Sequence, residues 1–163
     1  MKLVSKTLIY TGGHTHERGV GILFDATTAR KKGRRGRCPI SDRVVAAKLV
    51  DKPLNIRIIQ VYASTSDGED VEVEKFYEDI EKAKGYLKSQ DIIMLMGDFN
   101  ANVGDEKVED VVRPSGIGTV NERGSRLIES AKSMILPSQI PGIKTTLDES
   151  RLGRAPEIEV EIK

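Results

Sequence analysis

The sequence predicts an α/β or α+β fold in which sheets are covered by helices. Short apolar runs such as Gly19–Phe24 and Ile92–Met96 are bounded by turn residues, which is typical of strands. Between such runs the hydrophobic period changes to that of a helix, most clearly from Asp70 to Lys88. Strands and helices therefore alternate along the chain, and sheets packed against helices are the expected architecture.

The strands are predicted from runs of apolar residues in the first hundred positions and from a short alternating run near the C-terminus. Ile92–Met96 lacks alternation, which predicts burial on both faces and a central position in its sheet. In the last run, apolar residues alternate with glutamates. The predicted strands are Leu3–Tyr10, Gly19–Phe24, Val44–Val50, Asn55–Tyr62, Ile92–Met96 and Ile158–Ile162.

Two helices are predicted between and after these strands. The first covers Asp70 to Lys88 and places one apolar stripe among acidic and basic residues. The second runs from Glu122 to about Met134, with Asn121 as its N-cap and Pro137 beyond its end. Between the strand at 92–96 and this second helix lies a long polar loop.

Composition limits the class of protein. At 163 residues, 38% of them hydrophobic, the chain is long enough for one domain with a core, and with 4% aromatic residues that core must be mostly aliphatic. The formal net charge is +1, so attraction to nucleic acid must come from local patches. Cys38 is the only cysteine, which excludes a disulfide scaffold and predicts a reducing, intracellular compartment, nuclear or cytoplasmic.

No apolar run approaches the roughly 18 residues that span a bilayer, and the first ten residues lack the apolar stretch of a signal peptide. We therefore expect a soluble chain without a membrane partner.

Polar side chains follow the apolar run in the segment MLMGDFNANVGD, residues 94–105. Asp98, Asn100 and Asn102 stand at the end of the predicted strand, where their oxygens can hold a hard cation such as Mg²⁺ beside a phosphate. A carboxylate there can also take a proton from water. The same residue types favour tight turns, because Asp and Asn side chains mimic backbone turns. The spacing leaves both interpretations open.

A basic loop lies between two predicted strands. Its six cationic residues, Arg30, Lys31, Lys32, Arg34, Arg35 and Arg37, occupy eight positions and suit a phosphate backbone. A solvated hairpin loop or a nuclear import patch accounts for the same run. Tyr62, which closes a predicted strand, can present its phenol to a phosphate or pack half-buried.

The order of the motifs is more informative than any one of them. GVGILF, SDRVVAAKL, RIIQVYAST, an acidic helix, IIMLMGDFNANVG and GTVNERGSRLIE follow one another along the chain. In this order they resemble the endonuclease/exonuclease/phosphatase (DNase I-like) family, and within it the endonuclease domain of LINE-type, RTE-like retrotransposons. The resemblance runs from about Leu8 to Ser133 and is specific at GDFNANVG and NERGSRLIE.

This resemblance implies a four-layer α/β sandwich that hydrolyses phosphodiesters with Mg²⁺ or Mn²⁺. Asp98 would orient or deprotonate the attacking water and is a candidate metal ligand. Asn100 would hold the phosphate or the water, and Tyr62 would contact the phosphate.

The chain also departs from the family's pattern. The family's early Asn and its metal-binding Glu, in a Gln-Glu-Thr-like segment, come before the point where this sequence begins. Its late Asp-His pair has no counterpart, because no histidine follows His16. We therefore expect a partial domain over residues 1–136, followed by a divergent connector over residues 137–163.

The predicted function is a retrotransposon-derived, Mg²⁺-dependent endonuclease-like domain that is incomplete and weak or inactive alone. The alternative is a non-catalytic remnant of the same fold that binds nucleic acid or another protein. A phosphatase acting on inositol phosphates or lipids ranks below both. DNA is the expected partner, and uncovered sheet edges are expected to invite oligomerisation or a partner chain.

Overall fold

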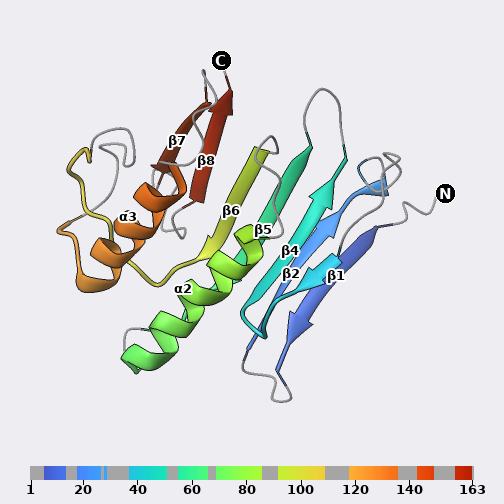
Figure 1. Ribbon diagram of the computed structural model, residues 1–163, viewed down its shortest axis with the longest axis horizontal. Helices are drawn as coiled ribbons and strands as arrows, with labels where there is room; N and C mark the ends of the chain where they lie inside the picture. The colour runs from blue at the N-terminus through green and yellow to red at the C-terminus, as the bar shows by residue number, and fades with distance from the viewer. Residues whose placement is uncertain are drawn as a thin grey trace.

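The computed structural model describes residues 6–13, 18–26, 28, 37–50, 55–65, 69–85, 92–108, 118–135, 143–148 and 157–162. Its helices are α2 (Asp70–Gly85) and α3 (Glu122–Ile135). Its strands are β1 (Thr7–Gly12), β2 (Gly19–Phe24), β3 (Arg37–Pro39), β4 (Val44–Leu49), β5 (Ile56–Tyr62), β6 (Ile92–Asp98), β7 (Ile143–Asp148) and β8 (Glu157–Ile162). Strands and helices are mixed in the order shown in Figure 1, which confirms the α/β class.

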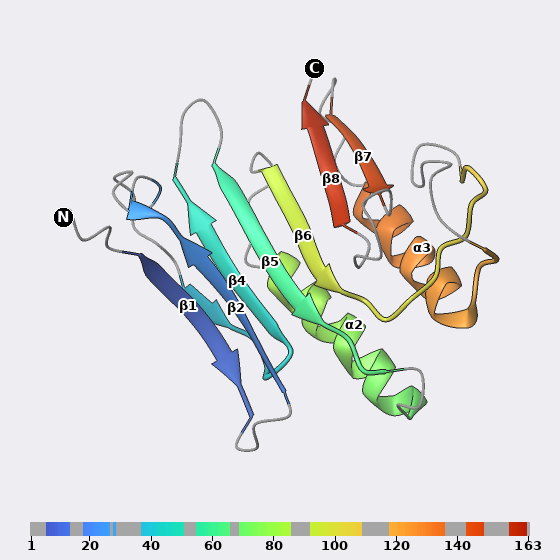
Figure 2. The same ribbon diagram turned by 180° about the vertical axis from the view of Figure 1, so that it is seen from behind.

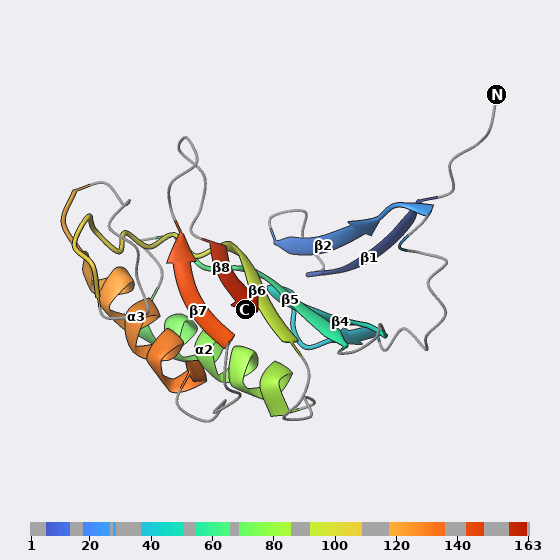
Figure 3. The ribbon, with the colours of Figure 1, turned by 90° about the horizontal axis from the view of Figure 1, so that it is seen from above.

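The described elements are arranged in three layers. The four-stranded sheet β3-β4-β5-β6 lies in the middle, α2 covers one of its faces with α3 on the same side nearer β7, and the β1–β2 hairpin lies on the other (Figure 3). A sheet in this position has two faces to bury, so its strands must carry apolar side chains on both.

Strand β4 meets this requirement by alternation, because successive side chains point to opposite faces. Val44 and Ala46 join the core beneath the helices, whereas Val45 and Ala47 join the core beneath the hairpin. The helix-side core also contains Ile59, Val61, Phe76, Tyr77, Ile80, Leu95, Phe99, Val103, Leu127, Ile128 and several alanines. The hairpin-side core adds Ile9, Val20, Ile22 and Phe24.

The central sheet is mixed. Strand β4 pairs with its neighbours β3 and β5 in antiparallel fashion. Strand β5 pairs with β6 in parallel, and α2 is the crossover between them. Parallel strands need such a crossover, and it brings their carboxyl ends to one edge of the sheet. The register places Tyr62 opposite Asp98 at that edge.

The strands of the first hairpin are close to their predicted bounds. Strand β2 has the predicted bounds, and its side chains alternate between exposed and buried. Strand β1 continues two residues beyond its predicted end, through Thr11 and Gly12, while residues 1–5 lie outside the described part. The outer face of the hairpin exposes Leu8 (58%), Tyr10 (64%) and Leu23 (58%).

The sequence predicted a central position for β6, and this prediction is wrong for the hydrogen-bonded sheet that the structure describes. Strand β6 pairs with β5 on one side and is the last strand of its sheet. Figures 1 and 2 show β8 alongside its other edge, but in a separate two-stranded sheet. The predicted burial on both faces is met only in part, because Leu95 is buried while the residues from Ile92 to Gly97 around it are half-buried. Continuous apolar character therefore does not determine a strand's place in the pairing order.

The segment predicted as a connector contains a second hairpin. Strands β7 and β8 pair in antiparallel fashion, with Ile143 opposite Ile162. Strand β8 matches the alternating run near the C-terminus, but β7 was not predicted, because prolines at 137 and 141 interrupt any period before it. The predicted boundary at residue 136 stays a prediction.

The helix predictions are close to the structure. Helix α2 begins at Asp70 as predicted and is described to Gly85, while residues 86–90 lie outside the described part. Helix α3 begins at Glu122, and the Oδ1 atom of Asn121 accepts a hydrogen bond from the Gly124 amide at 2.7 Å, as an N-cap does. In the part of the chain that the structure describes, no helix is long and apolar enough to cross a bilayer.

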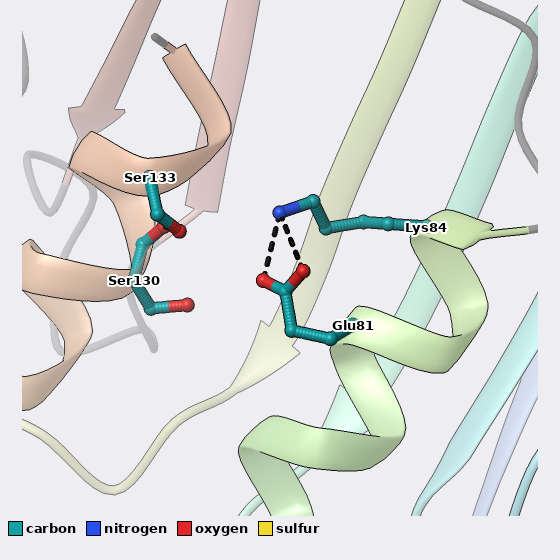
Figure 4. A network of polar contacts seen from close by, with 4 residues as sticks. All are labelled: Glu81, Lys84, Ser130 and Ser133. Atoms are coloured by element: carbon teal, nitrogen blue, oxygen red, sulfur yellow. Dashed lines mark hydrogen bonds and ion pairs between the residues drawn. The ribbon is translucent and has the colours of Figure 1, made fainter. Parts of the chain in front are cut away.

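Polar contacts join the two helices across their boundary. Arg126 of α3 donates to both carboxylate oxygens of Glu74 of α2, each at 3.0 Å, and its guanidinium lies 4.4 Å from the centre of the Tyr77 ring. Hydrogen bonding from Arg126 lowers the pKa of Glu74 below its usual range. Figure 4 shows contacts within each helix: Lys84 donates to Glu81 of α2 at 2.7 and 2.9 Å, and the Ser133 hydroxyl of α3 donates to the Ser130 carbonyl at 2.7 Å.

The N-terminal turn of α3 packs closely on the loop that follows β6. A Cβ atom at Gly124 would lie 1.8 Å from the carbonyl oxygen of Asn102, so this position admits only glycine without a shift of the loop. At Gly85, at the end of α2, a Cβ atom would meet no such neighbour within 4 Å.

We expect Gly124→Ala to destabilise the protein by about 1–3 kcal/mol, because the new methyl group must push the loop away. Gly85→Ala is the matched control, and its greater helix propensity should stabilise by up to about 1 kcal/mol. Urea unfolding followed by circular dichroism measures both. Equal effects of the two substitutions would contradict this view of the α3 packing.

Tyr77 generates a prediction for alkaline pH. Burial raises the pKa of its phenol from 10.0 to about 12. Between these values the unfolded chain releases the phenolic proton while the folded chain keeps it, so stability falls as pH rises from 10 to 12. This contribution is fully present below pH 10 and amounts to about 3 kcal/mol.

We therefore expect wild-type protein to lose stability more steeply than Tyr77→Phe across this range, with the two similar in slope between pH 7 and 9. Urea midpoints measured at half-unit steps of pH give the comparison. Parallel profiles up to pH 12 would show that Tyr77 does not titrate with a raised pKa.

Candidate functional site

The candidate site lies where β5 and β6 end. Tyr62 and Asp98 are paired in register, and the Ala63 amide donates to the Asp98 carbonyl at 2.8 Å, which extends the pairing one residue beyond the strand. The strands approach closely because Gly97 has φ +145° and no side chain. A Cβ atom there would lie 1.9 Å from the carbonyl oxygen of Val61. The GDFN segment therefore begins from a rigidly held strand end.

Asn100 links the turn after β6 to β5. Its backbone adopts φ 47°, a left-handed conformation that Asn tolerates better than most residues. Its amide N–H donates to Oδ1 of Asp98 at 3.0 Å, and its side-chain Nδ2 donates to the Ala63 carbonyl at 3.0 Å. Asp98 is exposed and Asn100 half-buried. The structure thus brings together three predicted site residues: Tyr62, Asp98 and Asn100.

Asn102, the third polar residue of the motif, has a structural role. Its Oδ1 accepts from the Gly104 amide at 2.9 Å, and its backbone exchanges hydrogen bonds with Asn121. The side-chain oxygen of Asn102 is therefore used to form the turn, as the turn interpretation of the motif predicts.

Arg43 is a candidate that the sequence analysis did not single out. It immediately precedes β4, and its guanidinium donates from Nη1 to the Tyr62 carbonyl at 3.3 Å while lying 5.7 Å from the centre of the Tyr62 ring. No local pattern in the sequence marks it, because its place follows from the antiparallel pairing of β4 with β5, in which Val44 lies opposite Val61. A residue just before β4 must therefore lie beside the end of β5.

The basic loop cannot be placed beside these residues. Arg30, Lys31, Lys32, Arg34 and Arg35 lie outside the described residues, and Arg37 is described only as the backbone at the start of β3. Their predicted contact with nucleic acid stays a prediction.

The edge combines one carboxylate, one amide, one phenol and one guanidinium. A guanidinium and a phenol are hydrogen-bond donors to phosphate oxygens, and an exposed carboxylate can accept a proton from water or bind a hard cation. One oxygen of Asp98 is oriented by the Asn100 amide, which leaves the other for such a role.

The donor set fits Mg²⁺ or Mn²⁺ only in part. Among the described residues no group of three His, Cys, Asp or Glu side chains is close enough to hold a metal ion. Mg²⁺ is often held by one or two carboxylates together with water and substrate phosphates, and Asp98 supplies one. A groove of about 410 Å³ between α2 and α3 contains none of the predicted site residues.

Comparison with known proteins gives relatives in sequence and in structure. No family model matches the chain. Craniofacial development protein 2 of Bos taurus is 38% identical over 89 residues, which are 55% of this chain and 15% of that protein. The protein of the same name from Tragulus javanicus is 36% identical over 89 residues, covering 55% of this chain and 16% of that protein. The matched segment is thus a small part of these relatives.

The fold of nearly the whole chain resembles that of a solved structure. The endonuclease domain of TRAS1, a telomere-specific non-LTR retrotransposon, superimposes with a TM-score of 0.62 at 10% sequence identity. The superposition covers 97% of this chain and 65% of that domain. The chain therefore has an α/β fold like that of the TRAS1 endonuclease domain, and over about half its length it is similar in sequence to craniofacial development protein 2.

Proposed function

We propose that this chain is a retrotransposon-type, endonuclease-like domain that contacts a phosphodiester of DNA at the edge formed by β5 and β6, with hydrolysis that is weak or absent in isolation. The observation that carries this proposal is the registered pair of Tyr62 and Asp98, joined at the same edge by Asn100 and Arg43. The structural relative from TRAS1 is an endonuclease domain, and the shared fold supports a nuclease-type domain here.

Each residue of the edge has a role in this proposal. Arg43 and Tyr62 donate to the phosphate oxygens, Asn100 presents its amide to the phosphate or the water, and Asp98 orients the water or accepts its proton. A bound Mg²⁺ or Mn²⁺ would supply charge neutralisation at the phosphate and a more acidic water. Asp98 is the residue that would hold it.

Weak hydrolysis is the expectation because two groups typical of such sites are missing from the described edge. Among the described residues no group of three His, Cys, Asp or Glu side chains lies close enough together to hold a metal ion, and no histidine follows His16 in the sequence. Loss of one preorganised stabilising group lowers a rate by about 10²–10³, and two losses by roughly 10⁴–10⁶ if they act independently. DNA binding needs neither group.

The first experiment is relaxation of supercoiled plasmid by purified chain, with Mg²⁺ or with EDTA. We expect no metal-dependent nicking above background, because the donor set for the metal is incomplete. Asp98→Ala should give the same result. Nicking that requires Mg²⁺ and disappears in Asp98→Ala would show that other residues complete the site.

The second experiment measures DNA binding as a function of salt. Each phosphate neutralised by a cation contributes a slope of about −0.9 to the plot of log affinity against log salt. We expect Arg43→Ala to reduce this slope by about 1, because it removes one phosphate contact. Lys132→Ala is the control, since it removes an equal charge at an exposed position near the C-terminal end of α3.

Neutralising Arg34 and Arg35 together tests the basic loop in the same assay and should reduce the slope by about 2. Binding that is independent of salt, or lost equally in the Lys132→Ala control, would contradict a phosphate-binding edge. Salt-dependent binding without nicking would favour the non-catalytic alternative over a working endonuclease.

A further inference from the structure

The side chain of Asn121 makes more contacts than a helix cap needs. Its Oδ1 atom accepts the Gly124 amide at 2.7 Å and also the Asn102 amide at 3.1 Å, which is nineteen positions away in the sequence. The backbone N–H of Asn121 donates to the Asn102 carbonyl at 3.1 Å. One residue therefore joins the start of α3 to the loop after β6 in both directions.

That loop carries the turn on which the candidate site depends. Residues 99–104 form no helix or strand, so side chains must supply much of their hydrogen bonding. At one end, Asn100 is tied to Ala63 and Asp98, in the left-handed conformation already described. At the other end, Asn102 is tied to Gly104 and to Asn121. The conformation at Asn100 lies between two anchors, and Asn121 supplies the second.

We propose that Asn121 is a positioning residue for the phosphate-contacting edge: by holding Asn102 against the start of α3, it maintains the turn that directs Asp98 and Asn100. The consequence for DNA contact rests on the function proposed above. The positioning itself does not, because it is a property of the loop and can be measured without DNA.

The presence of asparagine rather than serine at position 121 supports this role. A serine would cap the helix about as well as asparagine, because the cap requires only one acceptor close to the helix start. Its side chain is one atom shorter and does not reach both amides. The absence of a side chain at Gly124 acts in the same direction, because it lets the Asn102 carbonyl approach the helix.

Three substitutions separate capping from positioning. Asn121→Ser keeps a good cap and loses the bond to Asn102, Asn121→Ala loses both, and Asn121→Asp keeps an acceptor of the same length for both amides. Amide hydrogen exchange of the full chain, resolved by residue with NMR, reports the loop at Asn100, Asn102 and Gly104. The Ser125 amide, which donates to the Asn121 carbonyl, reports the start of α3.

We expect exchange at the three loop amides to rise about tenfold in Asn121→Ser and Asn121→Ala and to stay near wild type in Asn121→Asp. Exchange at Ser125 should rise only in Asn121→Ala. A residue that only caps the helix would leave the loop amides unchanged in Asn121→Ser, and that result would overturn the proposal. Loop exchange that rises equally in Asn121→Asp would also overturn it.

Binding of a short duplex DNA links the turn to the edge. We expect Asn121→Ser to weaken binding by about tenfold without changing the salt slope, because no cation is removed. Ser133→Ala, an exposed change at the far end of α3, should leave binding unchanged. Loosened loop amides with unaltered DNA affinity would overturn the link between the turn and the edge. Failure of wild type to bind DNA would refute the proposed function, while the exchange experiment would still decide the positioning.

Discussion

The parallel pairing of β5 with β6 is the constraint on which the rest of the structure depends. It requires α2 as a crossover, and it brings two carboxyl ends to one edge in a register that sets Tyr62 opposite Asp98. The close approach at Gly97, where any side chain would meet the Val61 carbonyl, holds the two ends together. The candidate site lies at this edge because burial of unpaired polar side chains inside the sheet is unfavourable, whereas the strand ends reach solvent.

The central sheet also has to serve two cores. On β4, alternate residues face the helices and the hairpin, so one short strand contributes to both clusters. This arrangement keeps the strand-end edge rigid, because α2, α3 and the hairpin all hold the sheet that carries it. The outer face of the hairpin belongs to neither core, and its apolar side chains Leu8, Tyr10 and Leu23 are exposed. The predicted contact of uncovered surface with a partner chain or a second copy stays a prediction.

The loop after β6 explains why one motif supports two interpretations. The bonds of Asn100 and Asn102 are turn chemistry, and the same bonds leave Asp98 exposed at the strand end with one oxygen oriented. Turn formation and a phosphate-contacting role are therefore compatible, because the first creates the geometry for the second. The tie from Asn121 extends that geometry to α3, so the two segments of highest resemblance, GDFNANVG and NERGSRLIE, meet in space.

By itself the sequence determined the elements and the candidate residues of the β6 loop, because hydrophobic period, caps and turn residues are local signals. It predicted the starts of α2 and α3, the cap at Asn121, and Tyr62, Asp98 and Asn100 as strand-end residues. Only the tertiary structure decided the half-exposed hairpin, the place of β6 at the end of its hydrogen-bonded order, the existence of β7, and the arrival of Arg43 beside Tyr62. These depend on pairing between distant segments, and the free energy of that pairing comes from contacts that no local pattern contains.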